Sequence, residues 1–173
     1  MAEAAPEFDA PTPLTPQHDL GPFNSGEAAL DQWLRQRALQ NMLLAASKTY
    51  VACAAGTPRV VAYYALSMGQ VLNHEATGAM RRNMPAQIPA VLIGRLAVDS
   101  AWQGKGLGGS LLQDAVRRSM RAAREVSARL LVVHAISSAA EAFYLHHGFS
   151  RLPVATPTLA LDFVKVSKLA PLG

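Results

Sequence analysis

A strand, a glycine-rich loop and the start of a helix follow one another between Ile93 and Leu112, and this stretch constrains the chain most. The residues up to Val98 are mostly apolar, which predicts a buried strand. Glycine at positions 104, 106, 108 and 109 lets the backbone approach a ligand closely and adopt positive φ values. The first N–H groups of the following helix lack intrahelical partners and carry the positive end of the dipole. The stretch therefore predicts an anion-binding loop, most often one for phosphate.

Two interpretations of this loop follow from the residues alone. One is a tight turn packed against a sheet, without any ligand. The other is a dinucleotide site, because Gly104-x-Gly106-x-x-Gly109 fits the G-x-G-x-x-G pattern. That pattern requires an acidic residue about 20 positions later, at the end of the next strand. Glu125 has the spacing but precedes the apolar run at 130–133, which disfavours a dinucleotide site. A P-loop is excluded because no Gly-Lys-Ser/Thr closes the pattern.

A third interpretation is a resemblance to a known family. The pattern Gln103-x-x-Gly106-x-Gly108 after an apolar strand resembles the pyrophosphate loop of the GCN5-related N-acetyltransferases (GNAT). The run E-A-F-Y-L-H-H-G-F at 141–149 resembles the short helix of that family, closed by its tyrosine and Gly-Phe pair. The two motifs stand in the family's order, with a helix and a strand at 131–135 between them. Together they are far more specific than either motif alone.

The resemblance implies the GNAT fold. This is an α/β (α+β) architecture with a mixed, mostly antiparallel central sheet, splayed at the acetyl-CoA site and flanked by helices. The length of 173 residues suits one domain. We expect residues 13–173 to form that domain, and the acidic, Ala- and Pro-rich residues 1–12 to be a flexible leader.

Composition limits the partners and the compartment. The chain has 16 Lys and Arg residues against 12 Asp and Glu, a net charge of +4, which permits an acidic partner such as a phosphate ligand or RNA. The lone cysteine, Cys53, excludes an intrachain disulfide framework. No apolar run reaches the ~18 residues of a membrane helix, and the N-terminus does not resemble a secretory signal. We therefore expect a cytoplasmic protein that does not associate with membranes.

Periodicity and turn signals predict the other elements. A helix is expected from Asn24, as the N-cap of a capping box with Glu27, to about Met42. A second helix is expected at 108–124. A short third helix is expected after Ser137 or Ser138, with Ser138 and Glu141 as a capping box and Gly148 after its end. The expected strands lie at 14–20, 47–53, 60–66, 91–98, 130–135, 149–153 and 159–165.

The reaction implied by the resemblance transfers an acetyl group from acetyl-CoA to an amine, with acetyl-CoA as cosubstrate and no metal. The backbone edge at 96–98 is expected to pair with the pantetheine arm. The Val98 N–H is the candidate donor to the thioester carbonyl oxygen, which gains negative charge. Lys105 either adds a positive charge at the diphosphate or is simply a solvated lysine. The expected cofactor-binding residues are Leu96, Ala97, Val98, Gln103, Gly104, Lys105, Gly106, Leu107, Gly108, Gly109, Ser110, Ser138 and Phe143.

Tyr144 matches the family's general acid, which would protonate the leaving thiolate. A tyrosine with a pKa of about 10 stays protonated at pH 7 and can donate; the alternative is a half-buried packing residue. A general base is harder to assign. His134, His146 and His147 titrate in the useful range, and a hydrogen-bonded structural role for His134 is an equal alternative. An α-amine, with a pKa of about 7.7–8.0, does not require a base, so the lack of a clear carboxylate in the motif favours an α-amino acceptor.

A wider set of motifs resembles the acetyltransferase toxins of type II toxin–antitoxin systems. This resemblance extends from about residue 14 to 161. It implies acetylation of the α-amine of aminoacyl-tRNA, which blocks translation, and also a homodimer and a neutralising ribbon-helix-helix antitoxin. By analogy, Lys48 and Arg95 are candidate contacts to tRNA or its acceptor end. The motifs are F-x-S-G at 23–26, L-D-x-W-L at 30–34, S-K-T-Y-V at 47–51, G-R-L-A-V-D at 94–99, W-Q-G-K-G-L-G at 102–108, V-H-A at 133–135 and A-F-Y at 142–144.

Other functions stay open. A GNAT acetyltransferase of a small-molecule amine, a polyamine or a protein N-terminus would need an acidic or tailored pocket. A non-enzymatic nucleotide- or RNA-binding module would need neither Tyr144 nor an intact glycine loop. For Arg95 in its apolar strand, a structural ion pair is the alternative to a cationic wall of the acceptor site. The arginines on one side of the helix at 108–124 form either a solvated face or an RNA-facing patch. They are Arg117, Arg118, Arg121 and Arg124.

Overall fold

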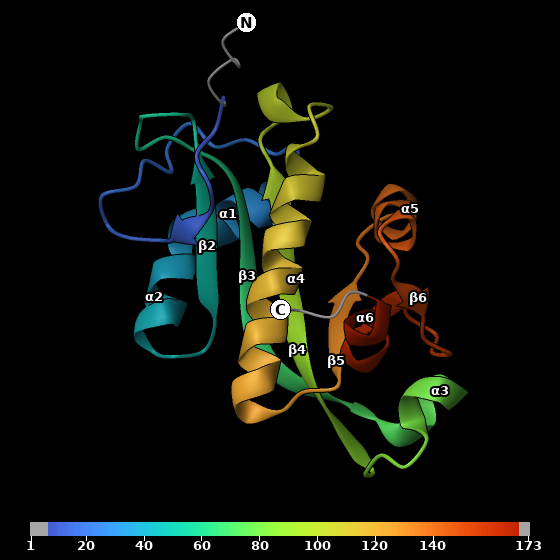
Figure 1. The fold of residues 1–173 in the computed structure, drawn as a ribbon. Coiled ribbons are helices and arrows are strands. Elements are labelled where there is room, and N and C mark those ends of the chain that lie inside the picture. The colour runs from blue at the N-terminus through green and yellow to red at the C-terminus, as the bar shows by residue number, and fades with distance from the viewer. Residues whose placement is uncertain (1–6, 170–173) are drawn as a thin grey trace, which may run out of the picture. The chain divides into compact units, whose positions relative to one another are not determined.

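The computed structural model describes residues 7–169, which form two compact units. The first unit contains the residues up to 66 together with 95–115, and the second contains 67–94 and the residues from 116 on. Seven strands are hydrogen-bonded in the order β1-β2-β3-β4-β5-β7-β6 (Figure 1). Their bounds are β1 Thr12–Pro13, β2 Lys48–Cys53, β3 Val60–Leu72, β4 Gln87–Val98, β5 Leu130–His134, β6 Ser150–Arg151 and β7 Thr158–Asp162. The helices are α1 Ala28–Gln36, α2 Ala38–Leu43, α3 Gly78–Arg81, α4 Leu107–Val126, α5 Ser138–His146 and α6 Phe163–Leu169, with 3₁₀ turns η1 Asn73–Glu75 and η2 Ser100–Trp102.

In the first unit, the antiparallel strands β1, β2 and β3 pack against α1 and α2. Tyr50 of β2 lies opposite Tyr64 of β3, and Val51 lies opposite Tyr63. Leu34 of α1 is almost fully buried in a core cluster that also holds Val51 and Tyr63. Burial of this apolar surface is what holds the helices on the strands.

In the second unit, β5 runs parallel to β4 from Ala90↔Leu130 to Ile93↔Val133. The β1–β2, β2–β3, β5–β7 and β6–β7 pairs are antiparallel, so the sheet is mixed and mostly antiparallel, as expected for the GNAT fold. The β5–β7 ladder runs from Leu130↔Asp162 to His134↔Thr158 and is buried except at His134, the last residue of β5.

The expected strand at 14–20 is wrong. Pairing of the expected segment with β2 extends only one bond beyond β1, from the Leu14 N–H to the Thr49 carbonyl, 2.9 Å. Proline at 13 and 16 removes backbone donors, so the segment turns instead of continuing a ladder. A bond from the His18 N–H to the Thr15 carbonyl, 3.2 Å, closes that turn.

The expected capping box at Asn24 is also wrong. The helix begins at Ala28, with Glu27 as an N-cap that makes no side-chain bond. The Asn24 Oδ1 instead accepts the N–H of Gly26, 3.0 Å, which is the local turn that asparagine favours. The expected single helix is two helices, because Arg37 leaves helical geometry between α1 and α2.

Two further boundaries differ near the C-terminus. Ser137, one of the two expected caps, accepts the Ala140 N–H at 3.1 Å, so the capping box from Ser138 does not form. Glu141, the expected capping-box partner of Ser138, forms an ion pair with Arg151 instead. The last strand ends at Asp162, whose carboxylate accepts the Val164 N–H at 3.0 Å and starts α6 there.

The stretch expected to be a flexible leader is partly paired with the first unit. Phe8 forms an antiparallel bridge with Ala54, and the Asp9 N–H donates to the Cys53 carbonyl at 2.8 Å. The Asp9 carboxylate also accepts the Gly56 N–H, 3.1 Å. The open edge beside β2 supplies these partners. Residues 1–6 of the expected leader, and 170–173 of the expected domain, lie outside the described residues.

Candidate functional site

The glycine loop lies between η2 and α4 in the first unit. Gly104 has φ +76° and Gly106 has φ +81°. A Cβ atom at either position would meet nothing within 4 Å. Glycine is therefore required here by the backbone conformation and not by crowding.

The backbone N–H groups of this loop are available to a ligand. Within residues 7–169, no hydrogen bond uses the N–H groups from Gly104 to Gly109. The first helical bond of α4 runs from the Ser110 N–H to the Gly106 carbonyl, 3.2 Å. Free donors at the N-terminus of a 20-residue helix form an anion site. The loop leaves these donors open, and its role as the diphosphate loop stays a prediction.

Gln103 fixes the start of the loop through its side chain. Its Nε2 donates to the carbonyl of Val98 at 2.9 Å and to the carbonyl of Ser25 at 3.0 Å. Its backbone N–H is directed to the Ser100 carbonyl at 3.4 Å, so the series of free amides begins at Gly104.

The end of β4 presents one backbone edge away from β3. The Asp99 N–H donates to the Val61 carbonyl of β3, 2.8 Å. Because backbone groups alternate along an antiparallel strand, those of Val98 and Leu96 point to the opposite edge. The pairing of β4 with β5 ends at Ile93↔Val133, before this segment begins. The Val98 N–H is thus directed away from β3, where it could donate to the thioester carbonyl oxygen. The backbone groups of Ala97 point towards β3.

Lys105 carries a positive charge at the loop. Its ammonium lies 3.3 Å from the Glu7 carboxylate and 5.2 Å from the centre of the Trp102 ring. Both side chains of the ion pair are about half exposed, 49% for Lys105 and 64% for Glu7, so an incoming anion can compete for the lysine.

Tyr144 lies on α5 in the second unit. The residue is 5% exposed, and its ring packs against Phe143 and Phe149, with ring centres 5.2 and 5.4 Å away. Burial raises the pKa of Tyr144 to about 12. Its hydroxyl makes no hydrogen bond to any described residue. The group is therefore a protonated donor at neutral pH.

Two of the three candidate histidines make contacts that suit a structural role. His134 Nδ1 lies 2.9 Å from the Thr158 hydroxyl across the β5–β7 ladder, which fits the structural alternative. The His147 ring packs against Phe143, 4.6 Å between centres. Burial, and then the charge of His146, lower the pKa of His147. Ser138, an expected cofactor contact, is the exposed first residue of α5.

The two candidate substrate contacts are both in the first unit. The Arg95 guanidinium stacks over the Trp33 ring, 4.3 Å from its centre, and no described carboxylate lies within ion-pair distance. A cation–π contact therefore takes the place of the ion pair considered from the sequence. Lys48 is exposed at the start of β2, 5.8 Å from the centre of the Tyr50 ring.

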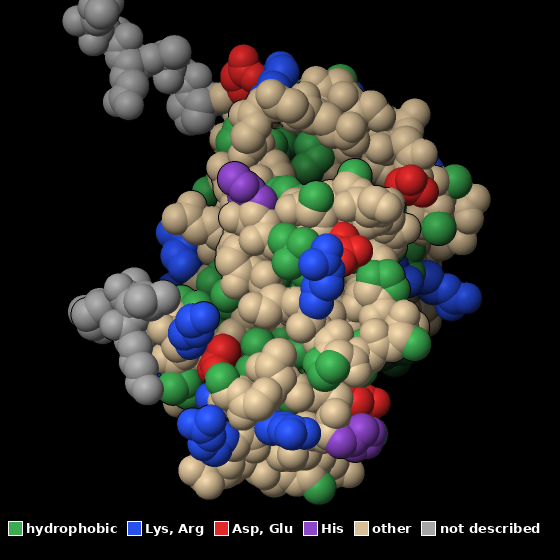
Figure 2. All heavy atoms as spheres, turned by 90° about the vertical axis from the view of Figure 1, so that its right-hand side faces the viewer, with side chains coloured by type: hydrophobic (Ala, Val, Ile, Leu, Met, Phe, Trp, Pro, Cys, Tyr) green, Lys and Arg blue, Asp and Glu red, His purple; other side chains and the backbone are tan. Residues whose placement is uncertain are grey.

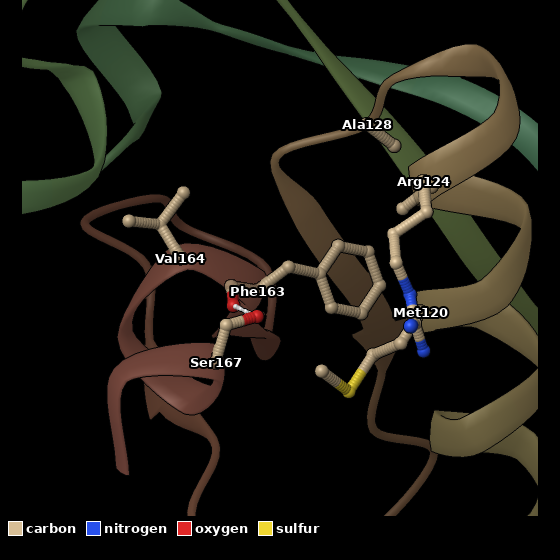
Figure 3. Close-up of a pocket in the computed structure, with 7 residues that line it drawn as sticks. Met120, Arg124, Ala128, Phe163, Val164 and Ser167 are labelled. Atoms are coloured by element: carbon tan, nitrogen blue, oxygen red, sulfur yellow. Dashed lines mark hydrogen bonds between the residues drawn. The ribbon is translucent and has the colours of Figure 1, made fainter. Parts of the chain in front are cut away.

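Basic side chains are also spread over the face drawn in Figure 2, with acidic side chains among them. A hollow of about 360 Å³ in the second unit contains none of the expected site residues (Figure 3). Its walls come from α4 and α6, where the Ser167 hydroxyl donates to the Phe163 carbonyl at 2.7 Å.

Within the described chain, no group of three or more His, Cys, Asp or Glu residues could hold a metal ion. None of the described helices is long and apolar enough to cross a membrane.

Comparison with known proteins identifies the family. Residues 45–151 match the model of the Acetyltransferase (GNAT) domain. The chain is 44% identical over 146 residues to the "tRNA-acetylating toxin" of Mycobacterium tuberculosis, covering 84% of this chain and 87% of that protein. The structure of AtaT complexed with acetyl-methionyl-tRNAfMet superposes with a TM-score of 0.87 at 26% identity, covering 94% of this chain and 98% of that one. A tyrosine-to-phenylalanine mutant of AtaT, bound to the C-terminus of the antitoxin AtaR and acetyl-CoA, gives 0.79 at 27% identity, covering 95% and 98%. The chain belongs to the GCN5-related N-acetyltransferase (GNAT) family.

Proposed function

We propose that this protein transfers the acetyl group of acetyl-CoA to the α-amine of aminoacyl-tRNA and so blocks translation as the toxin of a toxin–antitoxin pair. The observation that carries this proposal is the 44% identity to a tRNA-acetylating toxin over most of both chains. The likeness to AtaT complexed with acetyl-methionyl-tRNAfMet supports the same acceptor.

The first unit supplies a seat for the cofactor. The free N–H groups from Gly104 to Gly109 and the positive end of α4 suit the diphosphate of acetyl-CoA. Lys105 would add a charge once Glu7 releases it. The edge formed by Leu96 and Val98 would pair with the amides of the pantetheine arm. By the family resemblance, Ser110 of the first unit and Ser138 and Phe143 of the second are further proposed cofactor contacts.

The chemistry needs one fixed donor and one acid. The amine nitrogen attacks the thioester carbonyl carbon, and the Val98 N–H stabilises the negative charge on the oxygen. The carbon–sulfur bond then breaks, and the thiolate takes a proton from the Tyr144 hydroxyl. The new amide nitrogen loses its extra proton to water, and Tyr144 is reprotonated from water. An α-amine has a pKa of about 7.7–8.0, so no protein base is required.

The partners follow from the same comparison. AtaT is seen with the C-terminus of its antitoxin AtaR, and we propose that an antitoxin of the ribbon-helix-helix class neutralises this protein. A homodimer and a cytoplasmic location are further parts of the proposal. Lys48 and Arg95, exposed and half-buried in the first unit, are the proposed contacts to the tRNA acceptor end.

The decisive test uses purified protein, labelled acetyl-CoA and total charged tRNA. We expect label on aminoacyl-tRNA and none on deacylated tRNA. Aminoacyl-tRNA whose α-amine is already formylated is the matched control and should stay unlabelled. Transfer to a polyamine or a peptide N-terminus, with none to aminoacyl-tRNA, would favour the alternative of a small-molecule or protein acetyltransferase.

A further inference from the structure

A chain of hydrogen bonds joins the F-x-S-G…L-D motif at 23–31 to the end of β4. It begins at Asp31, a residue that is 5% exposed. The carboxylate accepts the Ser25 hydroxyl at 2.6 Å and the Ser25 N–H at 3.1 and 3.2 Å. Hydrogen bonds to an ionised acceptor are the strong ones, and a buried carboxylate requires them. Asp31 therefore fixes the orientation of Ser25.

Gln103 carries the connection on to Val98. The Ser25 carbonyl accepts one N–H of the Gln103 amide, 3.0 Å, and the Val98 carbonyl accepts from the same Nε2, 2.9 Å. A side-chain amide has two N–H donors, and both are used. Because the N–H and carbonyl of one strand residue lie on the same edge, this bond also holds the direction of the Val98 N–H.

A second set of bonds clamps the same turn from the other side. The buried carboxylate of Asp99 accepts the Asn24 N–H and the Ala101 N–H, both at 3.0 Å. The Asn24 carbonyl accepts the N–H and the hydroxyl of Ser100, both at 2.8 Å. The turn at 24–26 is thus hydrogen-bonded both to Gln103, at the start of the cofactor loop, and to Asp99 and Ser100, just before it. Gly26, with φ +92°, allows the chain to turn tightly there.

We propose that Asp31 and Ser25 are positioning residues for acetyl transfer, acting through Gln103 on the Val98 N–H. This inference rests on the proposed function, in which that N–H binds the thioester carbonyl. A donor that stabilises developing charge must be fixed before the reaction, since a misplacement of about 1 Å can cost ~10²-fold in rate. The F-x-S-G…L-D motif then has a role in catalysis although it lies outside the cofactor loop.

The test compares Asp31→Asn, Ser25→Ala and Gln103→Leu, alone and combined, in the full chain. We expect each single variant to lower kcat roughly 10- to 100-fold with little change in the dissociation constant of acetyl-CoA. Ser25→Thr keeps the hydroxyl and should restore most of the rate. Asp19→Asn is the matched control, because the exposed Asp19 carboxylate accepts one local N–H, that of Gly21, at 3.1 Å.

A double-mutant cycle separates positioning from stability. If the residues act in one chain, Asp31→Asn causes no further loss of kcat once Gln103 is leucine. Additive losses would overturn the inference, as would a lower melting temperature with unchanged kcat. Should Asp31→Asn fail to fold, Ser25→Ala carries the same cycle, because it leaves the Ser25 N–H bonds to Asp31 in place.

An infrared measurement needs no acceptor and separates this inference from the proposed function. Acetyl-CoA labelled with carbon-13 at the carbonyl is bound to each protein. In the wild type the carbonyl stretch should fall to lower frequency, and in Asp31→Asn it should move back towards the value in water. Equal frequencies in the two proteins would overturn the inference. A wild type that acetylates no aminoacyl-tRNA would overturn the proposed function alone. The infrared comparison would still decide whether Asp31 and Ser25 position the Val98 N–H.

Discussion

The Lys105 ammonium lies 3.3 Å from the Glu7 carboxylate, so an acid from the N-terminal segment pairs with the cation of the glycine loop. Cofactor diphosphate would have to compete with this carboxylate. An exposed ion pair stabilises by about 0–1 kcal/mol. We therefore expect Glu7→Gln to tighten acetyl-CoA binding roughly 2- to 5-fold at low salt.

Calorimetric titration at two ionic strengths checks this prediction. The gain should vanish at about 0.5 M salt, where the Debye length is only a few ångströms. Glu27→Gln is the control, because Glu27 caps α1 without a side-chain bond. A gain that persists at high salt would mean that Glu7 acts by some means other than its charge.

Replacing Tyr144 with Phe removes the proposed acid and keeps the ring that packs against Phe143 and Phe149. We expect kcat to fall about 10²-fold or more, with the dissociation constant of acetyl-CoA unchanged. Steady-state kinetics and calorimetry measure the two quantities. A variant with the wild-type rate would leave Tyr144 as a packing residue.

The pH dependence of kcat/KM follows from two groups. Burial raises the pKa of Tyr144 to about 12, so this acid stays protonated through pH 10 and is lost only as the pH rises towards 12. The acceptor α-amine loses its proton at about pH 7.7–8.0. The rate should therefore rise through about pH 8 and show no falling limb up to about pH 10. A fall between pH 8 and 10 would contradict the assignment of Tyr144.

Gly106 needs its positive φ of +81°. Gly106→Ala should weaken acetyl-CoA binding, because a residue with a Cβ pays about 1–2 kcal/mol of backbone strain at this φ. A steric clash is not the cause, since a Cβ there meets nothing within 4 Å. Gly106→Asp should weaken binding further, because its charge repels the diphosphate. The control is Gly78→Ala, at the exposed start of α3, where the backbone is not in the left-handed region and space is open. Calorimetry with acetyl-CoA measures all three, and equal affinities would contradict the placement of the diphosphate.

Arg129 and Asp162 form a largely buried ion pair, with N–O distances of 2.8 and 3.0 Å. Burial alone would raise the pKa of Asp162, but hydrogen bonds and charge from Arg129 outweigh it and lower the pKa. The pair therefore stabilises the folded state above about pH 4, and this stabilisation is lost as the pH falls through the lowered pKa. Arg129→Met should cost about 3 kcal/mol at pH 7 in urea unfolding, and much less at pH 3. Arg151→Met, which breaks a more exposed pair with Glu141, should cost about 0–1 kcal/mol at pH 7.

The functional loop could be predicted from the sequence because its chemistry is local. The need for positive φ at Gly104 and Gly106 and the free N–H groups at a helix start are properties of neighbouring residues. The same holds for the strands expected at 47–53, 91–98 and 130–135, whose apolar runs mark them, although β4 begins earlier, at Gln87. Local patterns failed where two short-range choices had similar energies, as at the caps Asn24 and Ser138.

Tertiary structure alone decided which distant groups meet. Arg95 stacks on Trp33 and not on a carboxylate, and the Gln103 amide bridges Ser25 and Val98. These contacts join segments far apart in the chain, and their partners depend on how the strands and helices of the first unit pack. The sequence by itself therefore determined the family, the glycine loop and the proposed acid Tyr144, because those reside in contiguous motifs. What holds the loop and its donor in place depends on non-local hydrogen bonds, which exist only after the chain has folded.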